Sequence, residues 1–233
     1  MNDVTLVTGA TGFVGSAVAR VLRERGHRLR LFVRENSDRS NIAELDAELA
    51  IGDLSDPTTL PAALKGVKIL FHVAADYRLW VPDPSVMMKA NVDGTRNLML
   101  AALEAGVEKI VYCSSVAALG LSKDGTPADE ETYVTESSVI GTYKLSKYRA
   151  EQEVLKLVRE KGLPAIIVNP STPIGPRDIK PTPTGQMILD CASGRMPAYV
   201  ETGLNIVHVD DVAEGHVLAL EREIGRPSGR ERG

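Results

Sequence analysis

The chain begins with an apolar run and a glycine-rich turn, Val4-Thr5-Leu6-Val7-Thr8-Gly9-Ala10-Thr11-Gly12-Phe13-Val14-Gly15. Residues 4–8 have the composition of a buried β-strand, and the residues after the turn have helical periodicity. The glycine spacing allows a tight turn at Gly9, close backbone approach at Gly12 and close helix packing at Gly15. The N–H groups at such a helix end bind phosphate. The pattern predicts a dinucleotide site, with an ordinary strand-to-helix turn as the alternative.

A second motif, Tyr143-Lys144-Leu145-Ser146-Lys147, places a tyrosine and a lysine four residues apart. Residues with this spacing share one face of a helix. A nearby ammonium favours the ionised phenol and lowers the pKa of a tyrosine from its ordinary value of ~10. We therefore expect Tyr143 to transfer a proton and Lys147 to lower its pKa. A solvent-facing pair on an amphipathic helix is the alternative.

Strand-like and helix-like runs alternate along the chain. The strand-like runs are residues 4–8, 28–34, 47–51, 67–74, 108–114 and 164–169, and the helix-like runs are residues 13–25, 57–65, 84–105 and 140–161. This alternation predicts an α/β fold, a doubly wound parallel sheet of Rossmann type with helices on both faces.

The residue composition changes after the last predicted strand. Prolines and glycines crowd the span from Pro170 to Gly185, which predicts a loop that leaves the sheet. We divide the chain into a dinucleotide-binding Rossmann domain at 1–169, a small and incomplete substrate-binding lobe at 170–223, and a disordered tail at 224–233.

Further motifs follow in a fixed order. They are Gly52-Asp53-Leu54, His72-Val73-Ala74-Ala75, Asn91-Val92-Asp93-Gly94-Thr95, Ser114-Ser115, Asn169-Pro170 and Val207-His208-Val209-Asp210-Asp211-Val212-Ala213. With the glycine turn and the Tyr143–Lys147 pair, this series resembles the extended short-chain dehydrogenase/reductases, the NAD-dependent epimerase/dehydratase family. That family includes nucleotide-sugar epimerases and dihydroflavonol 4-reductase-like enzymes. The stretches 75–82 and 169–178 are most similar to hopanoid-associated sugar epimerases. Such proteins continue well beyond the last helix of this chain, so the chain resembles a truncated form.

The resemblance implies roles for individual residues. Ser115, Tyr143 and Lys147 are the implied catalytic set, with Ser115 orienting the substrate oxygen and Ser114 free to bond locally. Asn91 organises water and backbone near the lysine, unless it only caps a helix. The implied cofactor contacts are Gly9, Thr11, Gly12, Phe13, Val14, Gly15, Arg34, Asp53, Leu54, Ala74, Ala75, Asn91, Ser114, Tyr143, Lys147 and Pro170. Among them, Asp53 and Leu54 meet the adenine, and Ala74 and Ala75 line the pyrophosphate and ribose.

The choice between NAD and NADP depends on the residue that ends the second strand. An acidic residue there bonds the ribose 2′-hydroxyl of NAD. This chain has Arg34 instead, with Arg39 close behind, and arginine favours a 2′-phosphate through charge-assisted hydrogen bonds. We therefore expect NADP to be preferred over NAD. Arg34 as a solvated residue after a strand is the alternative.

Candidate substrate contacts lie in two loops. Tyr77, Arg78 and Trp80 follow the fourth strand, where ligands sit in such sheets. Arg78 is suited to a phosphate or carboxylate and Trp80 to stacking on a ring; a cluster that packs the lobe is the alternative. Arg177 is a candidate contact for a diphosphate.

Composition bounds the remaining possibilities. The chain has 233 residues, 25% charged and 43% hydrophobic, with a formal net charge of -4, which gives no reason to expect nucleic acid or a membrane surface as a partner. We expect a cytoplasmic protein, with no membrane span, that acts on a small molecule and is compatible with a homodimer formed through a helix bundle. Cys113 and Cys191 are expected to be buried thiols, and the histidines lack metal-ligand spacing, so no metal is expected.

Three classes of function remain open. The first is an NAD(P)-dependent epimerase, an oxidoreductase and isomerase on a nucleotide sugar. The second is a carbonyl reductase of the dihydroflavonol 4-reductase type, which uses the same residues. The third is a dinucleotide sensor or scaffold without catalysis. The catalytic set argues against the third class, and the short carboxyl end argues for it.

Overall fold

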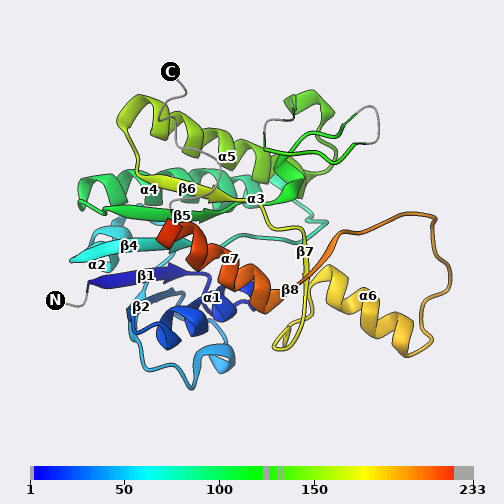
Figure 1. Cartoon of the computed structure of the whole chain (residues 1–233), viewed down its shortest axis with the longest axis horizontal. Helices are drawn as coiled ribbons and strands as arrows, with labels where there is room; N and C mark the ends of the chain where they lie inside the picture. The colour runs from blue at the N-terminus through cyan, green and yellow to red at the C-terminus, as the bar shows by residue number, and fades with distance from the viewer. Residues whose placement is uncertain (1–2, 123–125, 131, 133, 223–233) are drawn as a thin grey trace.

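The core of the molecule is a parallel β-sheet (Figure 1). The computed structural model describes residues 3–122, 126–130, 132 and 134–222. The strands are β1 (Val4–Thr8), β2 (Arg28–Val33), β3 (Glu48–Ile51), β4 (Val67–His72), β5 (Lys109–Cys113) and β6 (Ala165–Val168). Their order is β3-β2-β1-β4-β5-β6, and every pairing is parallel. The predicted doubly wound fold is confirmed, and the order reverses between β1 and β4, where such sheets bind ligands.

Helices cover both faces of the sheet. The helices of the described chain are α1 (Phe13–Glu24), α2 (Leu60–Leu64), α3 (Pro84–Met88), α4 (Gly94–Glu104), α5 (Thr142–Lys161), α6 (Pro183–Ala192) and α7 (Val209–Arg222), and of these α6 lies away from the sheet. The span 84–105, predicted as one helix, contains a π-helical turn at Lys89–Asp93 between α3 and α4. Helix α5 follows Gly141 and ends at Gly162, whose φ of 66° is the left-handed C-terminal geometry that glycine favours.

Two apolar cores hold the layers together. Side chains of α2, α4 and α5 pack on one face of the sheet, and side chains of α1 and α7 pack on the other. Helix α7 is far from α1 in sequence, yet Val217 and Leu220 share a core with Val18 and Leu22. At the edge of this layer Arg25 forms ion pairs with Glu214 and Glu221. Helix α7 therefore packs on the main sheet, although the division at residue 170 groups it with the lobe. That division stays a prediction.

The span 170–208 contains more regular structure than the sequence predicts. Strands β7 (Thr172–Ile174) and β8 (Ile206–His208) pair in parallel as a small second sheet, and α6 extends away from the main sheet (Figure 1). Three-residue strands give no readable alternation, because pairing between distant segments creates them. Thr182 begins α6 by accepting a hydrogen bond from the Gly185 N–H at 3.1 Å. The predicted tail at 224–233 lies outside the described residues.

No residue of α6 is buried. Cys191 on this helix is exposed, which corrects the expectation that both thiols are buried; Cys113 on β5 is half-buried. The helix-like pattern around Cys191 is real, but burial depends on a packing partner that sequence periodicity does not reveal.

Candidate functional site

The glycine turn has the backbone geometry that the sequence predicts. Gly9 has a φ of 74°, and a Cβ there would lie 2.7 Å from the Ala74 nitrogen. A Cβ on Gly15 would lie 2.1 Å from the Gly9 carbonyl oxygen, whereas a Cβ on Gly12 would meet that oxygen at 3.3 Å. Gly9 and Gly15 therefore allow the turn to pack between α1 and the segment after β4. A Cβ would have the most space at Gly12 among the three glycines. The backbone at Gly12 is therefore the most open to a ligand.

The first turn of α1 is suited to an anion. Gly12 precedes the helix without a side-chain cap, and the first turn contains no acidic residue. The N–H groups at this end thus keep their positive partial charge. Phe13 is buried in the core beneath the turn, so any cofactor contact it makes comes from its backbone. These features fit a dinucleotide pyrophosphate.

A cavity of about 560 Å³ lies where β2 and β3 end. Its lining residues are Arg34, Glu35, Asn36, Ile51, Gly52, Asp53 and Thr59. The structure thus brings together Arg34 and Asp53, two predicted cofactor contacts that are 19 positions apart in sequence. Leu54 lies beside Gly94 at the start of α4. The cavity fits the adenosine end of a dinucleotide, and Arg34 is one of its lining residues.

Lys147 is buried on α5, only 3% exposed. Its Nζ donates a hydrogen bond to the Cys113 carbonyl oxygen at 2.9 Å and lies 5.1 Å from the centre of the Tyr112 ring. Burial lowers the pKa of Lys147, while the charges of Cys113 and Glu151 raise it. The amine is therefore anchored at the carboxyl end of β5, next to the Ser115 loop.

The Tyr143 phenol lies near the Ser115 side chain. Burial raises the pKa of the Tyr143 phenol, and the neighbouring Ser115 hydroxyl opposes that rise. The sequence predicts that Lys147 lowers the pKa of Tyr143, and the structure does not have this effect. Burial of the phenol outweighs the other effects on that pKa, and the Lys147 amine bonds the Cys113 carbonyl instead. The Ser115 Oγ also accepts a hydrogen bond from the Ala117 N–H at 3.1 Å.

The local capping bond that the sequence suggests for Ser114 is made by Ser115. Ser115, not Ser114, caps the short turn that follows β5. Ser114 is buried, and its Oγ has no hydrogen-bond partner among the described residues. The Pro170 carbonyl accepts a hydrogen bond from the Val116 N–H at 3.0 Å, so Pro170 lies beside this serine loop.

Asn91 does not cap a helix. It lies buried in the π-helical turn, a conformation often found at functional sites. Its amide nitrogen donates to the Ser146 Oγ at 2.9 Å and to the Asp76 carbonyl at 2.8 Å, and its oxygen accepts from the Asp76 N–H at 2.7 Å. Asn91 thereby joins the loop after β4 to helix α5.

Ala74 and Ala75 continue from β4 into the loop that Asn91 holds. The Ala74 N–H donates to the Thr8 Oγ1 at 3.2 Å, which is 2.8 Å from the His72 Nδ1. The His72 Nε2 lies 2.9 Å from the Thr95 Oγ1. Full burial, and then the charge of Lys147, lower the pKa of His72 to about 3. The neutral ring therefore ties β1, β4 and α4 together beneath the site.

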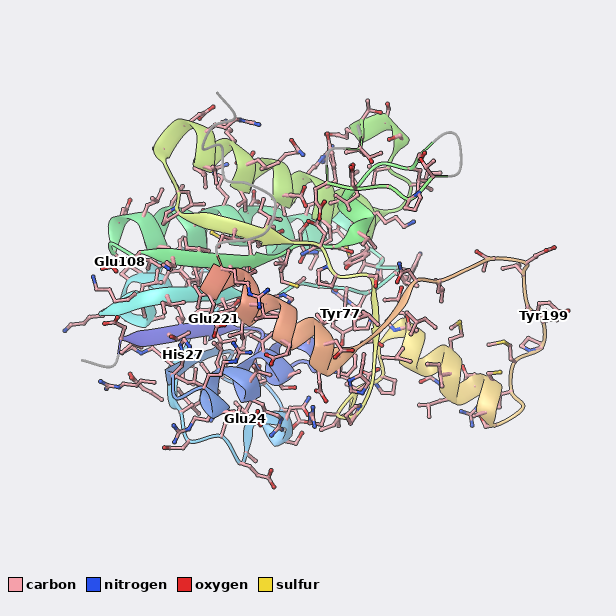
Figure 2. All side chains as sticks on the ribbon, in the orientation of Figure 1. Glu24, His27, Tyr77, Glu108, Tyr199 and Glu221 are labelled. Carbon is pink, nitrogen blue, oxygen red and sulfur yellow. The ribbon has the colours of Figure 1, made fainter. Side chains whose placement is uncertain are left out.

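The candidate substrate residues lie further out. Arg78 forms an ion pair with Asp76 at 2.5 Å, and Trp80 is 76% exposed. Figure 2 shows Tyr77 on the side of the sheet from which β7 and α6 extend. Arg177 has a φ of 71° and forms an ion pair with Asp210 at 2.7 Å, so a diphosphate contact requires that pair to open.

Three residues of the site received no role from the sequence. Glu151 and Asn169 bond each other close to Lys147 and Ser115. Asn41 donates at 3.3 Å to the carbonyls of both Thr11 and Arg177, joining the glycine turn to the lobe. Glu151 had a readable signal, since it lies four residues after Lys147 on the same helical face. Asn41 had none.

Two kinds of feature are absent from the part of the chain that the structure describes. No group of three or more candidate ligands is arranged to hold a metal ion. No described helix is both long and apolar enough to cross a membrane.

Comparison with known proteins identifies the family. The profile of the NAD dependent epimerase/dehydratase family matches residues 5–230. The chain is 50% identical over 222 residues to a putative dihydroflavonol 4-reductase of Synechocystis sp. (strain ATCC 27184 / PCC 6803 / Kazusa), covering 95% of this chain and 64% of that protein. The crystal structure of gox2253 is 88% identical with a TM-score of 0.91, covering 94% of this chain and 67% of that one.

A third similar protein is the UDP-glucose 4-epimerase of Thermus thermophilus, solved in complex with NAD. It has a TM-score of 0.80 and 26% identity, and the match covers 93% of this chain and 74% of that one. This chain belongs to the NAD dependent epimerase/dehydratase family, and the predicted resemblance is confirmed. It spans 64% of the length of the Synechocystis relative.

Proposed function

We propose that the protein is an NAD(P)-dependent oxidoreductase of the extended short-chain dehydrogenase type, which reduces the carbonyl group of a small molecule. The observation that carries this proposal is the juxtaposition of Tyr143 with Ser115, beside the buried Lys147 that is anchored at the carboxyl end of β5. A phenol, a hydroxyl and an amine at this edge of the sheet form a proton-transfer site next to the dinucleotide crevice.

The cofactor is supported by the shape of the crevice. The turn at Gly9 and Gly15, the uncapped start of α1 and the Arg34 cavity fit a pyrophosphate and an adenosine. A bound nicotinamide cofactor supplies the hydride. Because Arg34 lines the adenosine cavity, we propose that NADP binds more tightly than NAD.

Each catalytic residue has a defined task in this proposal. Tyr143 donates its phenolic proton to the carbonyl oxygen as that oxygen gains negative charge. Ser115 holds the same oxygen through its hydroxyl, whose position the Ala117 N–H fixes. Lys147 keeps its amine at the Cys113 carbonyl, within reach of the ribose side of the crevice.

One observation favours a reductase over an epimerase. Exposed apolar side chains occupy the loops that adjoin β4, β5 and α5. These are Leu79 and Trp80 after β4, Leu121 after β5 and Ile140 before α5. Such a rim suits a substrate with an aromatic or aliphatic part.

An epimerase on a nucleotide sugar, including the hopanoid-associated type, is the second candidate. The family and the similarity to the Thermus thermophilus UDP-glucose 4-epimerase support it. In that case Tyr143 would remove a hydroxyl proton while the same carbon would lose its hydride to the cofactor. The hydride would then return to the other face of the keto intermediate, and Tyr143 would give the proton back to the oxygen.

Cofactor stoichiometry tests the proposal. The chain is incubated with NADPH and a panel of aromatic and aliphatic ketones and aldehydes, and separately with NAD and UDP-sugars. A reductase forms one NADP per alcohol, an epimerase interconverts sugars without net cofactor use, and a sensor binds the dinucleotide but does neither. Only the first result supports the proposed reduction.

Tyr143→Phe should lower the rate of reduction ~10²–10⁴-fold while NADPH still binds, because a positioned acid contributes about that factor. Tyr148→Phe is the matched control, since Tyr148 is a half-buried tyrosine on the same helix. A Tyr143→Phe variant as active as this control would refute the role of Tyr143.

A further inference from the structure

Helix α5 has a third polar group on the face that bears Tyr143 and Lys147. Glu151 follows Lys147 by four residues, so the three side chains form a row along the helix. Glu151 is fully buried. A buried carboxylate is costly unless opposite charge and hydrogen-bond donors surround it, so its place in this row calls for an explanation.

The carboxylate of Glu151 is joined to the site by one amide. The Asn169 Nδ2 donates to the Glu151 Oε2 at 2.8 Å and to the Ser115 carbonyl oxygen at 3.1 Å. Asn169 directly follows β6, and the next residue, Pro170, accepts from the Val116 N–H. The carboxylate thus orients an amide that fixes the backbone of the serine loop.

The same carboxylate lies one helical turn from the buried Lys147 ammonium. The titratable groups that are electrostatically linked to Lys147 come from four elements: His72 on β4, Cys113 on β5, Glu151 on α5 and His216 on α7. The Tyr112 ring lies 5.1 Å from the Lys147 Nζ, and Tyr143 is on the same helix. Among these described groups, Glu151 is the one that carries a carboxylate. Its charge raises the pKa of Lys147, against the lowering by burial.

We propose that Glu151 is a positioning residue of this site: its buried carboxylate, one helical turn from Lys147, offsets the charge of that ammonium and, through Asn169, holds the Ser115 backbone in place. This inference rests on the proposed function for the roles of Lys147 and Ser115. The proposed electrostatic coupling between Glu151 and Lys147 belongs to the folded chain and can be measured without turnover.

The first test measures NADPH binding without substrate, from neutral to mildly alkaline pH, for the wild type, Glu151→Gln and Glu160→Gln. Glutamine keeps an oxygen that accepts from Asn169 but lacks the charge, and Glu160 is an exposed carboxylate on the same helix. We expect Glu151→Gln to bind normally at neutral pH and about tenfold more weakly at alkaline pH, because the ammonium then loses its proton earlier. The control should follow the wild type, and equal profiles for all three would overturn the proposal.

The second test is a double-mutant cycle on unfolding by urea, with Lys147→Met, Glu151→Gln and the double variant. Glu151→Gln alone leaves a buried ammonium unbalanced, whereas in the Lys147→Met background it removes an unbalanced carboxylate. We expect a coupling of at least about tenfold in the unfolding equilibrium constant. Additive effects would overturn the pairing whatever the protein catalyses, so this result separates failure of the inference from failure of the proposed function.

A third measurement addresses the amide. Asn169→Ala should lower kcat while leaving the pH dependence of NADPH binding unchanged, because it frees the Ser115 backbone without removing the Glu151 charge. A wild-type kcat in this variant would overturn the part played by Asn169.

Discussion

Replacing Gly15 by alanine should disrupt the turn that shapes the dinucleotide crevice. The added Cβ would lie 2.1 Å from the Gly9 oxygen and 2.5 Å from the Gly9 carbon. Relief requires a backbone displacement of roughly 1 Å in a close-packed region. The turn has no space to retreat, because Gly9 itself packs against the Ala74 backbone. Overpacking of this kind costs up to ~3 kcal/mol, and the helix propensity of alanine offsets about 1 kcal/mol. The expected net loss is about 2 kcal/mol of unfolding free energy.

Urea unfolding followed by circular dichroism measures this loss of unfolding free energy. Titration with NADPH measures the affinity of the crevice for the cofactor. Gly215→Ala is the matched control, because Gly215 lies within α7 and a Cβ there would meet nothing within 4 Å. That variant should gain about 1 kcal/mol from helix propensity alone. Gly15→Ala should also lose more than about tenfold in NADPH affinity, since the displaced turn no longer presents its N–H groups. Wild-type stability together with wild-type affinity in Gly15→Ala would refute the reasoning.

Two further predictions concern charge. Arg34→Asp should reverse the preference for NADP over NAD, since a charge-assisted contact to the 2′-phosphate contributes ~1.5–3 kcal/mol; calorimetry that finds equal affinities in both proteins would contradict it. His72 has a folded pKa of about 3, below its ordinary 6.5, so the unfolded chain binds the extra proton and stability falls as pH drops through that window. The loss is about 2 kcal/mol at about pH 5. His72→Gln should remove this part of the pH dependence of urea unfolding, and an unchanged slope would count against the buried neutral ring.

The sequence alone determined the features that depend on neighbouring residues. The six main strands, α1 and α5 lie where hydrophobic periodicity and glycine punctuation place them. The glycine turn was readable because its spacing, its positive φ at Gly9 and the helix that follows are all local. Most of the candidate site was readable for a related reason. Residues that directly follow parallel strands meet at one edge of the sheet, as Arg34 and Asp53 do.

Tertiary structure decided what depends on distant partners. Whether Asn91 caps a helix or bridges a loop to α5 was settled by the approach of Asp76 and Ser146, 15 and 55 positions away. The pKa of Tyr143 is raised, whereas the sequence predicts that it is lowered. The spacing of two residues on a helix indicates that they are close, but it does not indicate how deeply they are buried. The packing of α7 on α1 and the Glu151–Asn169–Ser115 link arise when the fold brings separate segments together. Burial and long-range hydrogen bonds are properties of that assembled core, and no local pattern encodes them.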